Sequence, residues 1–119
     1  MKILVVEDER LISLVLARMI AALGHDVLAC MPSAEAALDF LDRNSADFVL
    51  LDIRLEGSMD GIEAATIIRK RWSIPLAFAS AYMDSDTKAR AAATEPIAML
   101  GKPVREADLR RLFGDLLSA

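Results

Sequence analysis

Five polar side chains suited to phosphate and metal chemistry each stand at or just past the end of a short apolar segment. They are Glu7, Asp8, Asp52, Ser80 and Lys102. Carboxylates brought close together raise one another's pKa unless a cation is present. Mg²⁺ prefers oxygen ligands and is often held by one or two carboxylates together with a phosphate. If the fold gathers these side chains, the set predicts a Mg²⁺ site shared with a phosphoryl group.

The same set contains a candidate nucleophile. A carboxylate that attacks phosphorus forms an acyl phosphate, which is a covalent intermediate. Asp52 is the best candidate because it stands alone after its apolar segment, whereas Glu7 and Asp8 are adjacent. Lys102 supplies a positive point charge for phosphate oxygens, and the Ser80 hydroxyl can donate a hydrogen bond to another oxygen.

Alternating strands and helices must position these residues. Short apolar runs predict strands at 2–6, 26–31, 48–51, 76–79 and 97–100, the first of them rich in β-branched residues. Helical spacing predicts helices at 10–23, 34–43, 61–72, 84–93 and 105–117. Ser33 and Asp60 are expected N-caps. In the first helix apolar residues recur every four positions and are expected to mark its apolar face: Leu11, Val15, Met19 and Leu23.

This order of elements predicts an α/β fold, a doubly wound, five-stranded parallel sheet with helices on both faces. The strand order common for such flavodoxin-like chains is 2-1-3-4-5, which makes strands one and three neighbours where the order reverses. Ligands bind beyond the carboxyl ends of the strands at that point. Glu7, Asp8 and Asp52 are therefore expected to converge.

Composition limits the class of protein. With 119 residues, 55% of them hydrophobic, the chain is expected to form one domain. A formal net charge of −4 argues against direct nucleic-acid binding. No apolar run approaches the ~18 residues that predict a membrane span. A single cysteine, Cys30, excludes an internal disulfide and fits the cytoplasm; we expect Cys30 to be buried and His25 to lie on the surface.

The motifs together resemble the response-regulator receiver domains of two-component signalling, which are CheY-like. The matching segments are residues 4–9 (LVVEDE), 50–55 (LLDIRL), 59–64 (MDGIEA), 79–81 (ASA) and 101–103 (GKP). The resemblance covers the whole chain, so residues 1–119 are expected to form a single receiver domain with no output domain. It implies a signalling switch that is not an enzyme.

The resemblance also implies roles for the metal ligands. Asp8 and Asp52 would bind Mg²⁺ directly, and Glu7 would act through a water molecule. The backbone carbonyl of Arg54 would be a further ligand. Mg²⁺ is thus the expected cofactor, and each ligand role is carried over from the matching position of the family.

For the reaction itself, the resemblance implies that Asp52 accepts a phosphoryl group from a sensor histidine kinase or a histidine phosphotransfer protein. Ser80 and Lys102 would bind the phosphoryl oxygens, and the Lys102–Pro103 peptide would be cis. Phosphorylation would change the face made by helix four, strand five and helix five. That face would bind a downstream effector, a fused output domain or a second copy of the chain.

Several positions depart from the family pattern. Met99 stands where an aromatic residue is common, so no aromatic switch is expected there, and Tyr82 is a substitute candidate. Val104 replaces a common phenylalanine, and residues 94–96 replace a frequent Gly-Ala turn.

Two other functions stay open at this stage. A pseudo-receiver would act as a phosphorylation-independent binding or dimerisation module, and it would not respond to Mg²⁺. A small phosphatase or phosphotransferase of similar topology would need a second carboxylate two residues after the nucleophile. That position holds Arg54.

Overall fold

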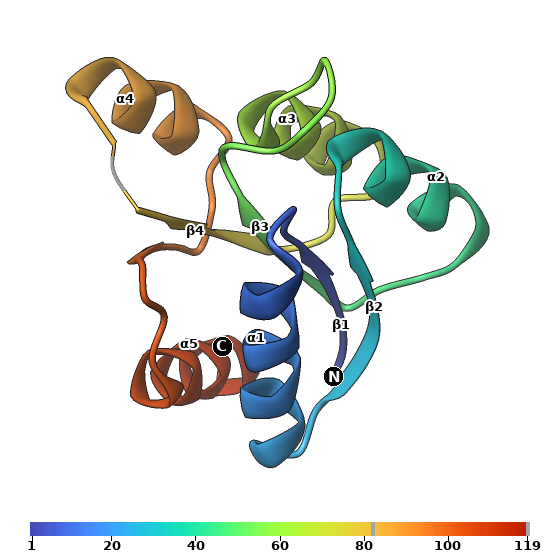
Figure 1. The fold of residues 1–119 in the computed structure, drawn as a ribbon, viewed down its shortest axis with the longest axis vertical. Helices are drawn as coiled ribbons and strands as arrows, with labels where there is room; N and C mark the ends of the chain where they lie inside the picture. The colour runs from blue at the N-terminus through green and yellow to red at the C-terminus, as the bar shows by residue number, and fades with distance from the viewer. Residues whose placement is uncertain (82, 119) are drawn as a thin grey trace.

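A computed structural model describes residues 1–81 and 83–118 of the chain. It contains one parallel sheet in the order β2-β1-β3-β4-β5, as predicted (Figure 1). The strands are β1 (Lys2–Val6), β2 (Asp26–Met31), β3 (Phe48–Asp52), β4 (Leu76–Ser80) and β5 (Ala98–Gly101). Tyr82, the substitute switch residue suggested by the sequence, lies outside the described residues.

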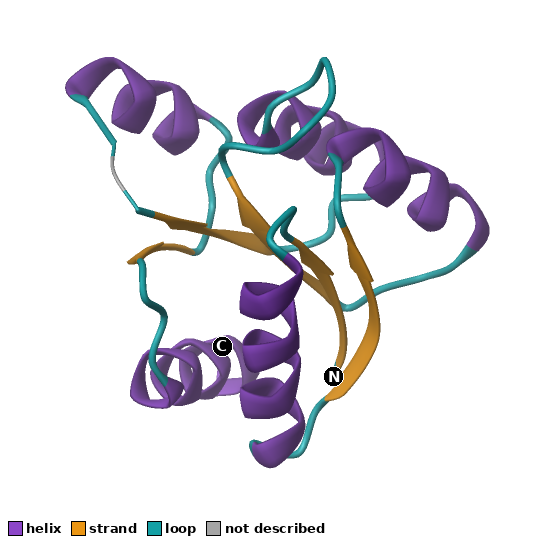
Figure 2. Ribbon diagram, in the orientation of Figure 1, coloured by secondary structure: helices purple, strands orange, loops and turns teal. Residues whose placement is uncertain are grey.

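In the described part of the chain, five helices cover the two faces of the sheet (Figure 2). They are α1 (Arg10–Ala22), α2 (Ala34–Arg43), α3 (Gly61–Arg71), α4 (Ser85–Ala93) and α5 (Glu106–Ser118). Helices α1 and α5 lie on one face, and α2, α3 and α4 lie on the other. Among the described helices, none is long and apolar enough to cross a membrane.

The central strands are apolar because both of their faces are covered. Every residue of β3 and β4 is buried. Successive side chains on a strand point to opposite faces, so Leu4 and Leu51 pack beneath α2 and α3 while Ile3 and Leu50 pack beneath α1 and α5. Two apolar layers therefore fix the sheet and, with it, the edge where the strands end.

Side-chain caps fix the beginnings of three helices. The Ser33 hydroxyl accepts a hydrogen bond from the Ala36 amide at 3.1 Å. Asp60 forms a capping box with Glu63, and Asp84 caps α4. The predicted caps Ser33 and Asp60 are confirmed, and Asp84 stands just before α4 rather than within it, because its carboxylate satisfies an otherwise free helix amide.

The predicted apolar face of the first helix is only half correct, because Met19 and Leu23 pack partly buried against the core while Leu11 and Val15 do not. Leu11 is 75% exposed and Val15 is 50% exposed, whereas Ser13, Leu16 and Ile20 are buried. A four-residue repeat drifts around a helix that has 3.6 residues per turn, so it identifies the helix but not the side that meets the sheet. Ser13 can be buried because its hydroxyl donates to the Arg10 carbonyl at 2.9 Å.

Two expectations about burial also need correction. Cys30 is exposed, because it lies on β2 at the edge of the sheet. Its thiol donates to the Ser13 carbonyl at 3.8 Å. His25 is partly buried rather than on the open surface, since its ring packs edge-to-face on Phe113 with 4.8 Å between centroids. The exposed fraction of both side chains depends on tertiary neighbours that the local sequence does not reveal.

Candidate functional site

The predicted acidic cluster forms at the carboxyl ends of β1 and β3. The two strands pair in parallel, with Val6 opposite Leu51. This register brings Glu7 and Asp8, which follow β1, next to Asp52 at the end of β3. Each of the three carboxylates offers an oxygen, and these oxygens lie within 4.8 Å of one another.

Lys102 reaches this cluster from the loop between β5 and α5. Its Nζ donates to Glu7 Oε1 at 2.6 Å and to Asp52 Oδ2 at 2.8 Å. Glu7 and Asp52 are buried, and the Lys102 side chain is only 14% exposed. Three carboxylates opposed by one ammonium leave an excess of negative charge, part of it shielded from water.

The pKa shifts follow from this arrangement. Burial raises the pKa of Glu7, and the neighbouring Asp52 and Asp8 act in the same direction, while Lys102 and the Glu9 amide oppose them. Burial alone would lower the pKa of Lys102, but its hydrogen bonds to Asp52 and Glu7 outweigh it, and the pKa is raised. The ammonium is therefore held in its charged form beside the carboxylates.

Backbone contacts shape the chain around Asp52. The Arg54 amide donates to Asp52 Oδ1 at 3.3 Å, and the Gly61 amide donates to the Ile53 carbonyl at 2.7 Å. A Cβ added at Gly61 would lie 1.9 Å from the Asp52 carbonyl oxygen. Only glycine permits this approach. The sequence motif at 59–64 contains Gly61, but this close approach to Asp52 was not predicted from the sequence. The Asp60-Gly61 pair was the feature that could have indicated it.

Ser80 and Lys102 complete one side of the site. Ser80 is the last residue of β4 and is buried, and its carbonyl accepts the Lys102 amide at 3.0 Å. A pocket of about 200 Å³ opens at this edge of the sheet. It is lined by Asp8, Glu9, Asp52, Arg54, Ser80, Ala81 and Lys102.

The structure thus brings together the residues singled out in the sequence. The pocket offers hard oxygen donors on one side and an ammonium on the other. Mg²⁺ accepts such oxygen ligands and retains water or phosphate in its other positions, so the donor set fits this ion. The excess negative charge gives a physical reason for a cation to bind. Asp52 is buried, but it is among the residues that line this pocket.

A sequence model described as the response regulator receiver domain matches residues 3–113. The chain belongs to this family. The cis peptide expected for a receiver at Lys102–Pro103 is present. Met99, at the position that is often aromatic, is 39% exposed on the edge strand β5.

Two of the curated relatives are named as regulatory proteins, and both are longer than this chain. The positive alginate biosynthesis regulatory protein of Pseudomonas aeruginosa is 38% identical over 92% of this chain and 44% of its own length. Transcriptional regulatory protein PdtaR of Mycobacterium tuberculosis is 29% identical over 91% of this chain and 52% of its own. The chain spans about half the length of the curated relatives it matches.

Solved structures agree with the fold. The signal receiver domain of a modulated diguanylate cyclase from Desulfovibrio desulfuricans has a TM-score of 0.92 and 32% identity, covering 98% of this chain and 93% of that one. The response regulatory domain of mrkE from Klebsiella pneumoniae has a TM-score of 0.88 and 25% identity, covering 99% and 96%. These likenesses confirm the CheY-like, flavodoxin-like receiver fold.

Proposed function

We propose that this receiver domain is a phosphoacceptor in a two-component phosphorelay, with Asp52 as the residue that is phosphorylated. The observation that carries the proposal is the position of the Asp52 carboxylate. It lies at the pocket, 2.8 Å from the Lys102 ammonium and beside Glu7 and Asp8. The donor would be the phosphohistidine of a sensor histidine kinase or a histidine phosphotransfer protein. We expect the reaction to take place in the cytoplasm, where ATP is the source of the kinase's phosphoryl group.

The transfer moves one phosphoryl group. A carboxylate oxygen of Asp52 attacks phosphorus and forms a P–O bond, while the P–N bond to the donor imidazole breaks. The imidazole nitrogen keeps the electron pair of that bond and is then reprotonated from solvent. Lys102 already bridges Asp52 and Glu7, and it opposes the negative charge that the phosphoryl group brings into the pocket.

Mg²⁺ would be held by Asp8 and Asp52 directly, by Glu7 through water and by the backbone carbonyl of Arg54. When bound, the ion would supply positive charge to the transferring phosphoryl oxygens. The protein contributes the fixed carboxylates, and their mutual repulsion before the ion binds favours its uptake.

Phosphorylation is proposed to act on the face made by α4, β5 and α5. Lys102 and Ser80 would bind phosphoryl oxygens, drawing the end of β4 and the following loop towards Asp52. Of the residues described in α4, Ala91 alone is buried, so few contacts hold this helix in place. The phosphoryl group would shift a population between two states by binding one of them better.

Apolar side chains of β5, α5 and the residue just before β5 are exposed and could contact a partner. Ile97, Met99 and Leu117 are 44%, 39% and 61% exposed. Exposed apolar side chains are common in protein interaction sites when they form a contiguous patch. The partner would be a downstream effector, an output domain of the same polypeptide or a second copy of the receiver.

The test is phosphorylation by a histidine donor carrying labelled phosphate, with and without Mg²⁺. The wild-type chain should acquire an acid-stable, base-labile label only with Mg²⁺, and Asp52→Asn should acquire none. Asp115→Asn removes the same charge from an exposed position on α5 and should label like the wild type. Label on the Asp52→Asn variant would overturn the assignment of the nucleophile.

Two observations favour a second function, a pseudo-receiver that binds a partner without phosphorylation. Met99 has no ring to turn inward, and Glu95 rather than glycine occupies a left-handed turn before β5. Amide NMR with Mg²⁺ and then beryllofluoride, a phosphoryl mimic, discriminates between the two. A response that begins at Asp8 and Asp52 and spreads to α4 and α5 supports the switch, whereas no response to either supports the binding module.

A further inference from the structure

The loop between β3 and α3 contacts the beginning of α2 through the carboxylate of Glu35. Figure 1 shows this loop passing the N-terminal end of α2. Glu35, in the first turn of α2, accepts hydrogen bonds from the Ser58 hydroxyl at 2.9 Å and from the Ser58 amide at 3.2 Å. One carboxylate oxygen thus receives both donors of a loop residue that is 23 positions away in the sequence.

The loop is shaped to accept this contact. Gly57 has a φ of +96°, and a Cβ there would lie 2.9 Å from Glu35 Oε1. A side chain at this position would therefore push against the carboxylate. Just before it, Glu56 forms a backbone bridge with Ser33, the cap of α2. Two independent contacts hold the middle of the loop against the same helix end.

The other end of the loop is fixed at the phosphoacceptor. The Arg54 amide donates to Asp52 Oδ1, and the Gly61 amide donates to the Ile53 carbonyl. Leu55 and Met59 pack against the apolar layer beneath α2, α3 and α4. Arg54, whose carbonyl is the expected metal ligand, therefore lies in a segment held at the site on one side and by Glu35 on the other.

We propose that Glu35 is a positioning residue that sets the metal affinity of the site by holding the β3–α3 loop in place. The inference rests on the proposed function, because it concerns the Mg²⁺ site assigned there. Glu35 does not touch the site itself, and it acts through Ser58 and the loop backbone. Its own helix amide and the Ser58 hydroxyl lower the pKa of Glu35, so the carboxylate is ionised at neutral pH.

The primary experiment is a Mg²⁺ titration followed by amide NMR in the absence of any phosphodonor. Loss of residues that orient metal ligands typically weakens metal binding by about 10- to 100-fold. Because Glu35 acts indirectly, through Ser58 and the loop backbone, we expect Glu35→Ala to raise the Mg²⁺ Kd by a smaller factor, about 3- to 10-fold. The Arg54 and Ser58 amide shifts should change with it, and the midpoint of thermal unfolding, measured in parallel, verifies that the variant is folded.

Two variants separate positioning from simple loss of charge. Asp39→Ala removes one negative charge from the same helix at an exposed position paired only with Arg43 among the described contacts, and its Mg²⁺ Kd should match the wild type. Glu35→Gln keeps an acceptor oxygen without the charge and should retain most of the affinity. An equal loss in Asp39→Ala and Glu35→Ala would overturn the proposal in favour of a general charge effect.

Ser58→Ala removes the hydroxyl that donates to Glu35 without changing any charge. It should weaken Mg²⁺ binding in the same direction as Glu35→Ala, and the double variant should be no weaker than Glu35→Ala alone. An unchanged Kd in Glu35→Ala, with the wild type binding Mg²⁺ normally, would overturn the positioning role and leave the proposed function intact. No Mg²⁺ binding by the wild type would instead overturn the proposed function.

Discussion

Glu7 is the residue at which burial and ion pairing compete most directly. Its 2.6 Å contact with Lys102 favours the ionised form, but burial and the two neighbouring aspartates favour the protonated form, and the net effect raises its pKa. A carboxyl whose pKa is raised on folding binds its proton more tightly in the folded state. The free energy of unfolding therefore falls as the pH rises past the ordinary value of 4.5.

We accordingly predict that Glu7→Gln stabilises the metal-free chain at neutral pH. Urea unfolding at about pH 7 should show a higher midpoint for the variant than for the wild type, and the difference should shrink near pH 4, where the carboxyl of the wild type is largely protonated. Added Mg²⁺ should also reduce the difference, because it stabilises the wild type by binding the folded state. A variant less stable than the wild type at both pH values would contradict this prediction.

Gly61 is the residue whose lack of a side chain the site depends on. The methyl group of Gly61→Ala would fall 1.9 Å from the Asp52 carbonyl oxygen, so the backbone must move. We expect a loss of about 1–3 kcal/mol in the free energy of unfolding, as for overpacked interiors, and weaker Mg²⁺ binding. Gly114→Ala, in α5 with nothing near its added Cβ, is the control and should be neutral or stabilising. Equal effects of the two substitutions would disprove the steric argument.

At the scale of elements, the turn between α4 and β5 carries a conformational cost. Glu95 has a φ of +58°, just after Thr94 ends the helix. This left-handed position costs roughly 1–2 kcal/mol for a residue with a Cβ, and glycine avoids most of it while losing some unfolded-state entropy. The family resemblance indicated a frequent glycine in this turn, and the backbone explains why.

We predict that Glu95→Gly stabilises the chain by about 0.5–1 kcal/mol. Urea unfolding measures the change, and Glu95→Ala is the matched control because it removes the same charge but keeps the unfavourable Cβ. The alanine variant should gain little or nothing. If both variants were stabilised equally, the gain would come from the charge and not from the backbone conformation.

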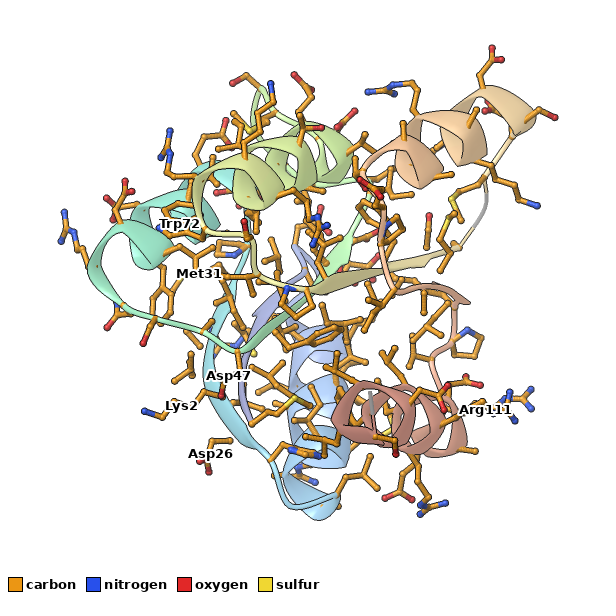
Figure 3. The ribbon with its side chains drawn as sticks, turned by 180° about the vertical axis from the view of Figure 1, so that it is seen from behind. Lys2, Asp26, Met31, Asp47, Trp72 and Arg111 are labelled. Atoms are coloured by element: carbon orange, nitrogen blue, oxygen red, sulfur yellow. The ribbon has the colours of Figure 1, made fainter. Side chains whose placement is uncertain are left out.

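At the scale of the whole molecule, Lys102 links the site at the ends of β1 and β3 to the edge strand β5 and to α5. It follows β5 and precedes α5, yet its ammonium reaches carboxylates beside β1 and β3. Pro103 and Val104, next along the chain, line an apolar groove with Leu11 and Val15 of α1. Because Lys102 lies between β5 and α5, a change at Asp52 can be passed to these elements through one side chain. Figure 3 shows the Arg111 side chain pointing away from α5.

We predict that Lys102→Ala keeps Mg²⁺ binding but loses coupling to the α4, β5 and α5 face. Removing the ammonium takes away a competitor for the carboxylates, so the Mg²⁺ Kd should stay equal or fall. With beryllofluoride, amide shifts should appear at Asp8 and Asp52 but not spread to α4 and α5. A spread as wide as in the wild type would count against Lys102 as the link.

The order of elements and the make-up of the site could be predicted from the sequence because both depend on local patterns. Continuous apolar runs require strands covered on both faces, and their alternation with helices leaves few parallel topologies. Once the order 2-1-3-4-5 holds, the ends of β1 and β3 must be adjacent. Asp8, Asp52 and Lys102 then meet at one edge of the sheet.

Other features depend on contacts between distant segments, and only the tertiary structure decided them. The buried side of α1, with Ser13 inside and Leu11 outside, depends on how the helix rotates against the sheet. The need for glycine at position 61 arises from the approach of α3 to the end of β3, and the Glu35–Ser58 contact joins α2 to the next loop. The sequence determined which residues could form the site, and long-range packing determined how closely their neighbours hold it.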